Sequence, residues 1–97
     1  MKQSFVTAER LNKYFSYTKR ALDKVKIAPE KKIDWKNSAE DFLDMARRYY
    51  SDAEDFAKKG DVVTAFAALN YAHGWLDAGA RLGLFDVGRD SELFVVD

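Results

Sequence analysis

Apolar residues recur at every third or fourth position in three long stretches of this chain, a spacing that predicts three amphipathic helices. The first helix is expected at about 7–27, because Thr7 can cap its start and Pro29 lacks the amide hydrogen that a continuing helix needs. Pro29 also restricts the residue before it, so residues 28–34 are expected to form a loop. The apolar stripe of this first helix comprises Leu11, Phe15, Thr18, Leu22 and Val25.

The second helix is expected at about 36–59, with an apolar face and an opposite charged face. At its end, Lys58 and Lys59 place positive charge against the helix dipole, and Gly60 can adopt the left-handed conformation that ends helices. Asp61 follows at once as a cap for the next helix, so the second and third helices must form an antiparallel hairpin. The apolar stripe comprises Ala39, Phe42, Ala46, Tyr49, Ala53 and Phe56, and the candidate caps at the start are Asp34, Asn37 and Ser38.

The third helix, expected at about 61–83, is apolar on two adjoining faces. Small residues dominate one face, which lets a neighbouring backbone approach closely: Ala65, Ala68, Leu69, Ala72, Leu76, Gly79 and Gly83. A second apolar arc lies beside the first, and we expect it to form an interface because a helix this apolar must be covered from more than one side. The residues of this predicted interface arc are Ala67, Tyr71, Trp75, Ala78 and Leu82.

The predicted fold is therefore all-α, an antiparallel up-and-down three-helix bundle over residues 1–85 with a short non-helical C-terminal tail over residues 86–97. Leu84 and Phe85 are expected to pack back onto the bundle after a cap at Gly83. The pattern leaves open whether the tail forms a short strand, docks on the helices or frays.

Composition narrows the function without naming it. The chain has no cysteine, which excludes disulfides, thiolate metal sites and cysteine nucleophiles. No apolar stretch approaches the roughly 20 residues of a membrane span, and the first ten residues lack the apolar core of a signal peptide. We therefore expect a cytoplasmic protein that does not bind membranes.

Charge is distributed unevenly, although its formal sum is zero. Residues 1–36 hold ten Lys and Arg against four Asp and Glu, whereas residues 37–97 hold six against twelve. This split predicts either a basic first helix lying against acidic neighbours or two copies docking with opposite charges facing. The alternative is a surface for an anion or for RNA.

One polar strip on the third helix has the appearance of a site: Asn70, His73, Asp77 and Arg81, interrupted by Gly74. On a ligand-binding interpretation, Asp77 orients His73 and Arg81 holds an anionic group. On a structural interpretation, the same residues form ordinary pairs four positions apart on a helix. A single histidine without cysteine makes no zinc site of the usual kind, and no residue is assigned a catalytic role, a metal or a cofactor.

The segment from Ala53 to Phe85 resembles the archaeal family of small helical proteins known as domain of unknown function 357. The resemblance is strongest from Gly60 to Phe85, in GDVVTAFAALNYAHGWLDAGARLGLF. The resemblance is weaker over the first two helices and does not extend past Phe85. It implies an up-and-down three-helix bundle from an archaeon, and it implies no activity.

The favoured hypothesis is a non-enzymatic protein-interaction or self-association module, forming a homo-oligomer or binding another protein through the interface arc or the charge split. The alternative is an RNA-binding or small-ligand-binding protein that uses the polar strip or the basic first helix. An enzyme is the third choice.

Overall fold

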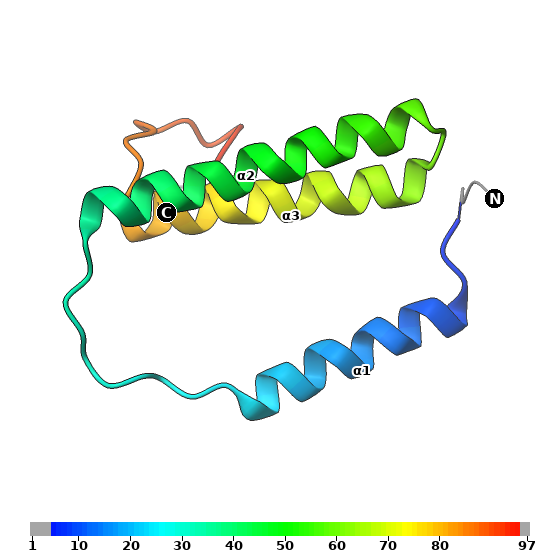
Figure 1. The fold of residues 1–97 in the computed structure, drawn as a ribbon, viewed down its shortest axis with the longest axis horizontal. Helices are drawn as coiled ribbons and strands as arrows, with labels where there is room; N and C mark the ends of the chain where they lie inside the picture. Colours follow the sequence, from blue (N-terminus) through cyan, green and yellow to red (C-terminus); the bar gives the residue numbers. More distant parts are fainter. Residues whose placement is uncertain (1–4, 96–97) are drawn as a thin grey trace.

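The computed structural model describes residues 5–95 and contains three helices: α1 (Ala8–Lys24), α2 (Trp35–Lys58) and α3 (Val62–Leu82). Consecutive helices run in opposite directions (Figure 1). The predicted all-α fold is confirmed. Residues 1–4 of the predicted bundle and 96–97 of the predicted tail lie outside the described part. Within that part, no helix is long and apolar enough to cross a membrane.

Side-chain caps fix the start of each helix. Thr7 Oγ1 accepts a hydrogen bond from the Arg10 amide at 3.1 Å, and Asp61 Oδ1 accepts one from the Thr64 amide at 3.1 Å, as predicted for both caps. Of the three candidate caps near the start of α2, Asp34 is the cap, with its Oδ1 3.0 Å from the Asn37 amide, and the other two lie inside the helix. Each cap satisfies one of the amide groups that a helix start leaves without a partner.

The first helix is shorter than predicted. It ends at Lys24, and Val25 is already extended, with ψ at 140°. Nothing in the sequence between Lys24 and Pro29 caps a helix end, and the end predicted near residue 27 relied on Pro29 and on the charged residues that follow it. A β-branched residue such as Val25 adds little helix propensity, so the helix ends early where no packing supports it.

Small residues form the contact between α2 and α3. The buried positions lie seven residues apart on each helix, which keeps them on one seam as the two helices run side by side. Because these side chains are so small, the backbones approach closely and the larger aromatic residues lie at the flanks of the seam. The buried residues are Ala46 and Ala53 of α2, and Ala65, Ala72 and Gly79 of α3.

Glycines in the left-handed conformation end α2 and α3. Gly60 has φ of 79° in the turn of the hairpin, and Gly83 has φ of 84° at the end of α3. After Gly83, the Leu84 amide donates to the Gly79 carbonyl at 2.8 Å and the Leu84 side chain is buried. The predicted return of Leu84 and Phe85 onto the helices is confirmed, since the Phe85 ring lies directly over Gly79.

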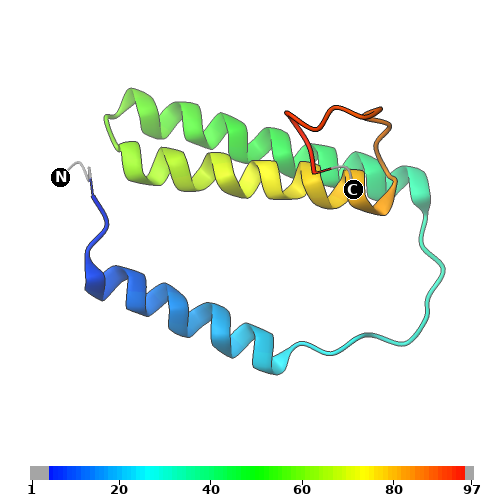
Figure 2. The same cartoon turned by 180° about the vertical axis from the view of Figure 1, so that it is seen from behind.

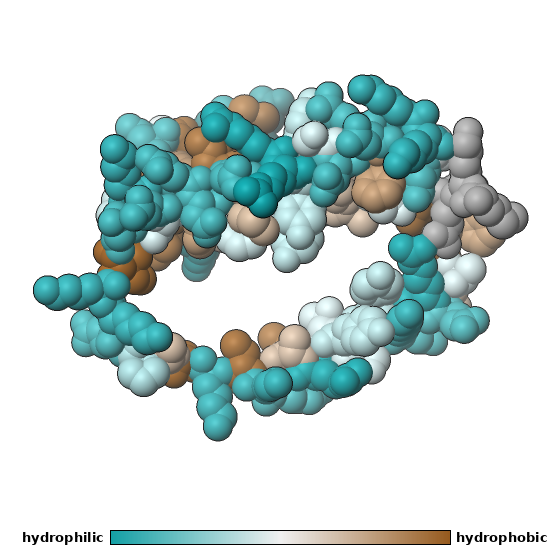
Figure 3. Space-filling view, viewed as in Figure 1, coloured by the Kyte–Doolittle hydropathy of each residue, from teal (hydrophilic) through white to brown (hydrophobic). Residues whose placement is uncertain are grey.

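The core lies between α2 and α3, and α1 stands apart from it. No residue of α1 is buried, and α1 packs against neither of the other helices. An opening passes between α1 and the hairpin, as the space-filling view shows (Figure 3). The radius of gyration is 16.0 Å, whereas a compact chain of this length has about 12.5 Å. The bundle is therefore open.

Candidate interaction surface

A row of packed aromatic side chains covers the flank of the hairpin that faces α1. The rings of Tyr49 and Tyr71 stack with centroids 4.4 Å apart, and Tyr71 lies parallel to Trp75 at 6.4 Å. Phe42 meets Trp75 edge-on at 5.0 Å. Trp75 is held by ring packing, because its indole nitrogen is buried without a hydrogen-bond partner among residues 5–95. We call this flank the aromatic face; it comprises Phe42, Tyr49, Phe56, Ala67, Tyr71, Trp75 and Ala78.

Four members of the predicted interface arc lie on the aromatic face. Ala67, Tyr71, Trp75 and Ala78 line its hollows, and Tyr71 remains 53% exposed. Leu82 is also exposed at the end of α3. The arc is therefore exposed apart from Trp75, which is half-buried, and its use as an interface remains a prediction.

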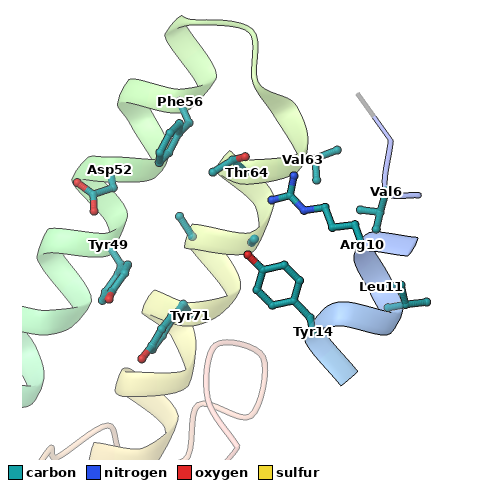
Figure 4. Close-up of a pocket in the computed structure, with 12 residues that line it drawn as sticks. Val6, Arg10, Leu11, Tyr14, Tyr49, Asp52, Phe56, Val63, Thr64 and Tyr71 are labelled. Atoms are coloured by element: carbon teal, nitrogen blue, oxygen red, sulfur yellow. The ribbon is translucent and has the colours of Figure 1, made fainter. Parts of the chain in front are cut away.

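A cavity of about 530 Å³ separates the start of α1 from the turn end of the hairpin (Figure 4). Tyr14 reaches from α1 toward α3, and Arg10 lies beside it, with its guanidinium 5.8 Å from the Tyr14 ring centre. The walls are mostly apolar, and Asp52 of α2 adds one acidic group. The lining from the first segment is Val6, Arg10, Leu11 and Tyr14; from the hairpin it is Tyr49, Asp52, Phe56, Val63, Thr64, Ala67, Ala68 and Tyr71.

The apolar stripe of α1 continues beyond this cavity without a covering surface. Leu11 lines the cavity, and Phe15 and Leu22 follow at helical spacing, each 67% exposed. In both ribbon views, α1 diverges from the hairpin, and the gap between them is widest at the C-terminal end of α1 (Figures 1 and 2). Of the stripe predicted from the sequence, the part from Leu11 to Leu22 therefore forms a free apolar face of α1, whereas Val25 lies beyond the end of the helix.

Electrostatics at the turn end connect α1 with the hairpin. Hydrogen bonds from the Thr64 side chain and amide lower the pKa of Asp61 below its ordinary value of 3.8, and the positive charge of Arg10 lowers it further. Asp61 starts α3, so a basic residue of α1 and an acidic residue of the hairpin attract one another there.

A second apolar groove lies on the other flank of the hairpin. It measures about 620 Å³, and its apolar walls are built from Leu43, Tyr50, Leu69 and Leu76. The sequence interpretation missed this groove, although Leu43 and Tyr50, seven residues apart on α2, carried the signal. The hairpin thus exposes apolar surface on both flanks of its seam.

Two residues of the predicted polar strip hold the tail. His73 Nε2 lies 2.6 Å from the Leu93 carbonyl oxygen, and Asp77 Oδ1 accepts the Val95 amide at 3.2 Å. His73 and Asp77 are 3.7 Å apart, and the Phe94 ring stacks on His73 at 6.3 Å. Of the alternatives left open for the tail, docking is the one observed, on the side of the hairpin away from α1 (Figures 1 and 2).

The other two members of the strip do not join this cluster. Asn70 is exposed, and Arg81 lines a small hollow of about 220 Å³ with Phe85 and Val95. His73 is half exposed. Among residues 5–95, no three His, Asp or Glu side chains are placed to hold a metal ion. Ligand binding by the strip remains a prediction, and the geometry gives a structural role to His73 and Asp77.

A family model described as "Protein of unknown function (DUF357)" matches residues 13–85 of the chain. The chain belongs to this family. The DUF357 match covers most of α1, all of α2 and α3, and the return to Phe85, so it includes both sides of the opening. The resemblance of Gly60–Phe85 to this family is confirmed and extends into α1, and the DUF357 description assigns no activity. Comparisons with curated proteins and with solved structures found no match.

Proposed function

We propose that this DUF357 protein is a non-enzymatic module that acts by self-association, with the apolar faces of α1 and of the hairpin forming the interface between two copies. The observation that carries the proposal is an excess of uncovered apolar surface. The hairpin has an apolar groove on each flank, and the chain has one amphipathic helix, α1, to offer as a cover. A single chain that closed α1 onto one flank would leave the other open.

The area of the surface supports a large interface. The chain exposes 8436 Å², whereas a compact monomer of this mass exposes about 5,700 Å². The excess of about 2,700 Å² per chain amounts to about 5,400 Å² for two copies, which is the size of the largest permanent interfaces, since these bury roughly 2,000 to 5,000 Å² or more in total.

Charge supports a second copy as the partner. Helix α1 has five basic and two acidic residues, whereas residues 37–82 have five basic and eight acidic residues. A surface that carries both signs in separate places is complementary to itself when two copies pair by a two-fold axis. The geometry favours no second function, because two of the four residues of the polar strip, His73 and Asp77, are engaged with the tail. An archaeal source and a cytoplasmic location remain predictions from the sequence.

Light scattering behind a sizing column tests the proposal, at micromolar and near-millimolar chain concentrations. We expect the wild-type chain to have the mass of a dimer. Trp75→Glu places a charge in the centre of the aromatic face and should yield a monomer that keeps its helical circular dichroism. Asn70→Glu adds the same charge on the exposed strip of α3 and should remain dimeric. A wild-type chain that stays monomeric at near-millimolar concentration would overturn the proposal.

A further inference from the structure

We infer that two copies of this chain exchange α1, so that the α1 of each copy packs on the aromatic face of the other copy's hairpin. The inference rests on the proposed self-association and specifies its geometry. A helix of 17 residues in a protein gets most of its stability from the packing of its amphipathic face. Because none of its residues is buried, α1 requires a surface that the described chain does not give it.

The connection between α1 and α2 is long enough for exchange. Residues 25–34 are ten residues long and contain no helix, whereas antiparallel neighbours in a bundle need only about two to eight residues. Val25 and Asp34, at its ends, are both extended. Ten extended residues reach roughly 33 Å, which is enough to carry a helix from one copy to the next. A connection of this length permits both closure onto the chain's own hairpin and exchange, so the choice between them rests on the surfaces that each arrangement covers.

The same connection is unusually apolar for a loop in water. Ile27 is fully exposed, Val25 is 72% exposed and Ile33 is 66% exposed. Closing α1 onto its own hairpin would leave this segment on the outside of a monomer. Exchange would bring the two connections against the second copy, which covers these side chains.

Exchange also explains what covers the apolar surface on each flank of the hairpin. The partner's α1 covers the aromatic face with Leu11, Phe15 and Leu22. The groove with Leu43 and Leu69 on the other flank then remains for contact between the hairpins. The basic charge of α1 lies against the acidic hairpin of the partner, with the same complementarity that Arg10 and Asp61 show at the turn end of the hairpin.

The chain has no cysteine, so introduced thiols report on pairing without interference. Tyr14→Cys and Ala68→Cys place thiols on opposite walls of the same cavity. The two substitutions are made in separate chains of different tag length, which are unfolded together in urea, refolded and oxidised.

Val6→Cys with Val63→Cys provides a second pair across the cavity, in case Tyr14→Cys does not fold. The control repeats the experiment with Lys19→Cys in place of Tyr14→Cys. Lys19 also lies on α1, but it does not line the cavity.

Exchange predicts a disulfide between the two different chains. This disulfide should form roughly a hundredfold faster than in the control. The packed cavity holds its two thiols at an effective concentration of about 1 mM, whereas a thiol outside the cavity meets the other only through collisions between molecules at about 10 μM. The doubly substituted chain should also give covalent dimers. An intrachain disulfide in the doubly substituted chain, within a sample that has the mass of a dimer, would refute exchange and leave self-association standing. A monomeric mass at every concentration would refute both.

Discussion

Tyr49 of α2 and Tyr71 of α3 stack with their ring centroids 4.4 Å apart and their planes inclined by 14°. The pair lies beside a seam whose buried residues are alanine and glycine, which bury little area. Stacked rings therefore contribute a large share of the specific contact between the two helices. The residues that stabilise the hairpin are at the same time those that it presents toward α1.

Tyr71→Leu keeps an apolar side chain and removes the ring contact. We expect it to lower the free energy of unfolding by about 0.5 to 1.5 kcal/mol beyond the loss of buried area. Urea titrations of the wild type, Tyr71→Leu, Tyr49→Leu and the double variant measure the coupling between the rings. Tyr50→Leu is the matched control, because no ring among residues 5–95 stacks on Tyr50. Additive effects of the Tyr49 and Tyr71 substitutions would show that the stack contributes nothing.

Two glycines of α3 should respond in opposite ways to alanine. At Gly79, an added Cβ would lie only 2.6 Å from Phe85 Cδ2, so the ring must leave its place and the tail must shift. We expect Gly79→Ala to destabilise the protein by about 1 to 3 kcal/mol, despite the better helix propensity of alanine. At Gly74, no atom lies within 4 Å of the added Cβ. Gly74→Ala should stabilise the helix by up to about 1 kcal/mol, measured in urea.

One result would contradict the prediction for Gly79. If both alanine variants became more stable by similar amounts, Phe85 would not be packed on Gly79. The near-ultraviolet circular dichroism of the aromatic residues distinguishes this case from a compensated shift of the tail.

The hairpin could be predicted from the sequence because local rules and packing agree there. Gly60 and Asp61 end one helix and start the next, which leaves the chain no room for any other arrangement. The seven-residue spacing of Ala65, Ala72 and Gly79 then specifies which face is buried. The caps Thr7 and Asp61 followed from residue type alone, since a short polar side chain at a helix start has one favourable role.

The position of α1 could not be predicted, because amphipathicity shows that a face must be covered without showing what covers it. The stripe with Leu11 and Leu22 is equally compatible with the chain's own hairpin and with that of a second copy. The docking of the tail could not be predicted from the sequence either. It depends on the backbone carbonyl of Leu93 and the amide of Val95, and a backbone group gives no signal in a sequence.

Asp61 should make stability dependent on acid pH. Its pKa is lowered in the folded chain, so its carboxylate contributes stability at pH values above the unfolded pKa, and this contribution is lost as pH falls through the folded pKa. Asp61→Asn keeps a residue that can cap a helix and removes the titration. The difference in urea midpoint between wild type and variant should be largest at about pH 6 and should vanish toward about pH 2.

Asp41→Asn, on the exposed surface of α2, makes the same change in charge without touching a cap and is the control for Asp61→Asn. A wild-type advantage that stayed constant from acid to neutral pH would contradict the assigned origin of the effect. It would mean that the cap contributes through its shape and not through its charge.

The tail should open when either of its two anchors on α3 is removed. The Leu93 carbonyl can only accept a hydrogen bond, so His73 Nε2 must carry the proton that joins them. Asp77 holds the Val95 amide through an acceptor oxygen, which Asn retains and Ala lacks. A net hydrogen bond contributes about 0.5 to 1.5 kcal/mol, so His73→Ala and Asp77→Ala should each speed hydrogen exchange of the Val95 amide by roughly three- to tenfold. Asp77→Asn should change it little, and Asn70→Ala, on the same strip, serves as the control. Unchanged exchange in both alanine variants would mean that the tail is held by Phe85 and Leu84 alone, and the polar strip would then be free to bind a ligand.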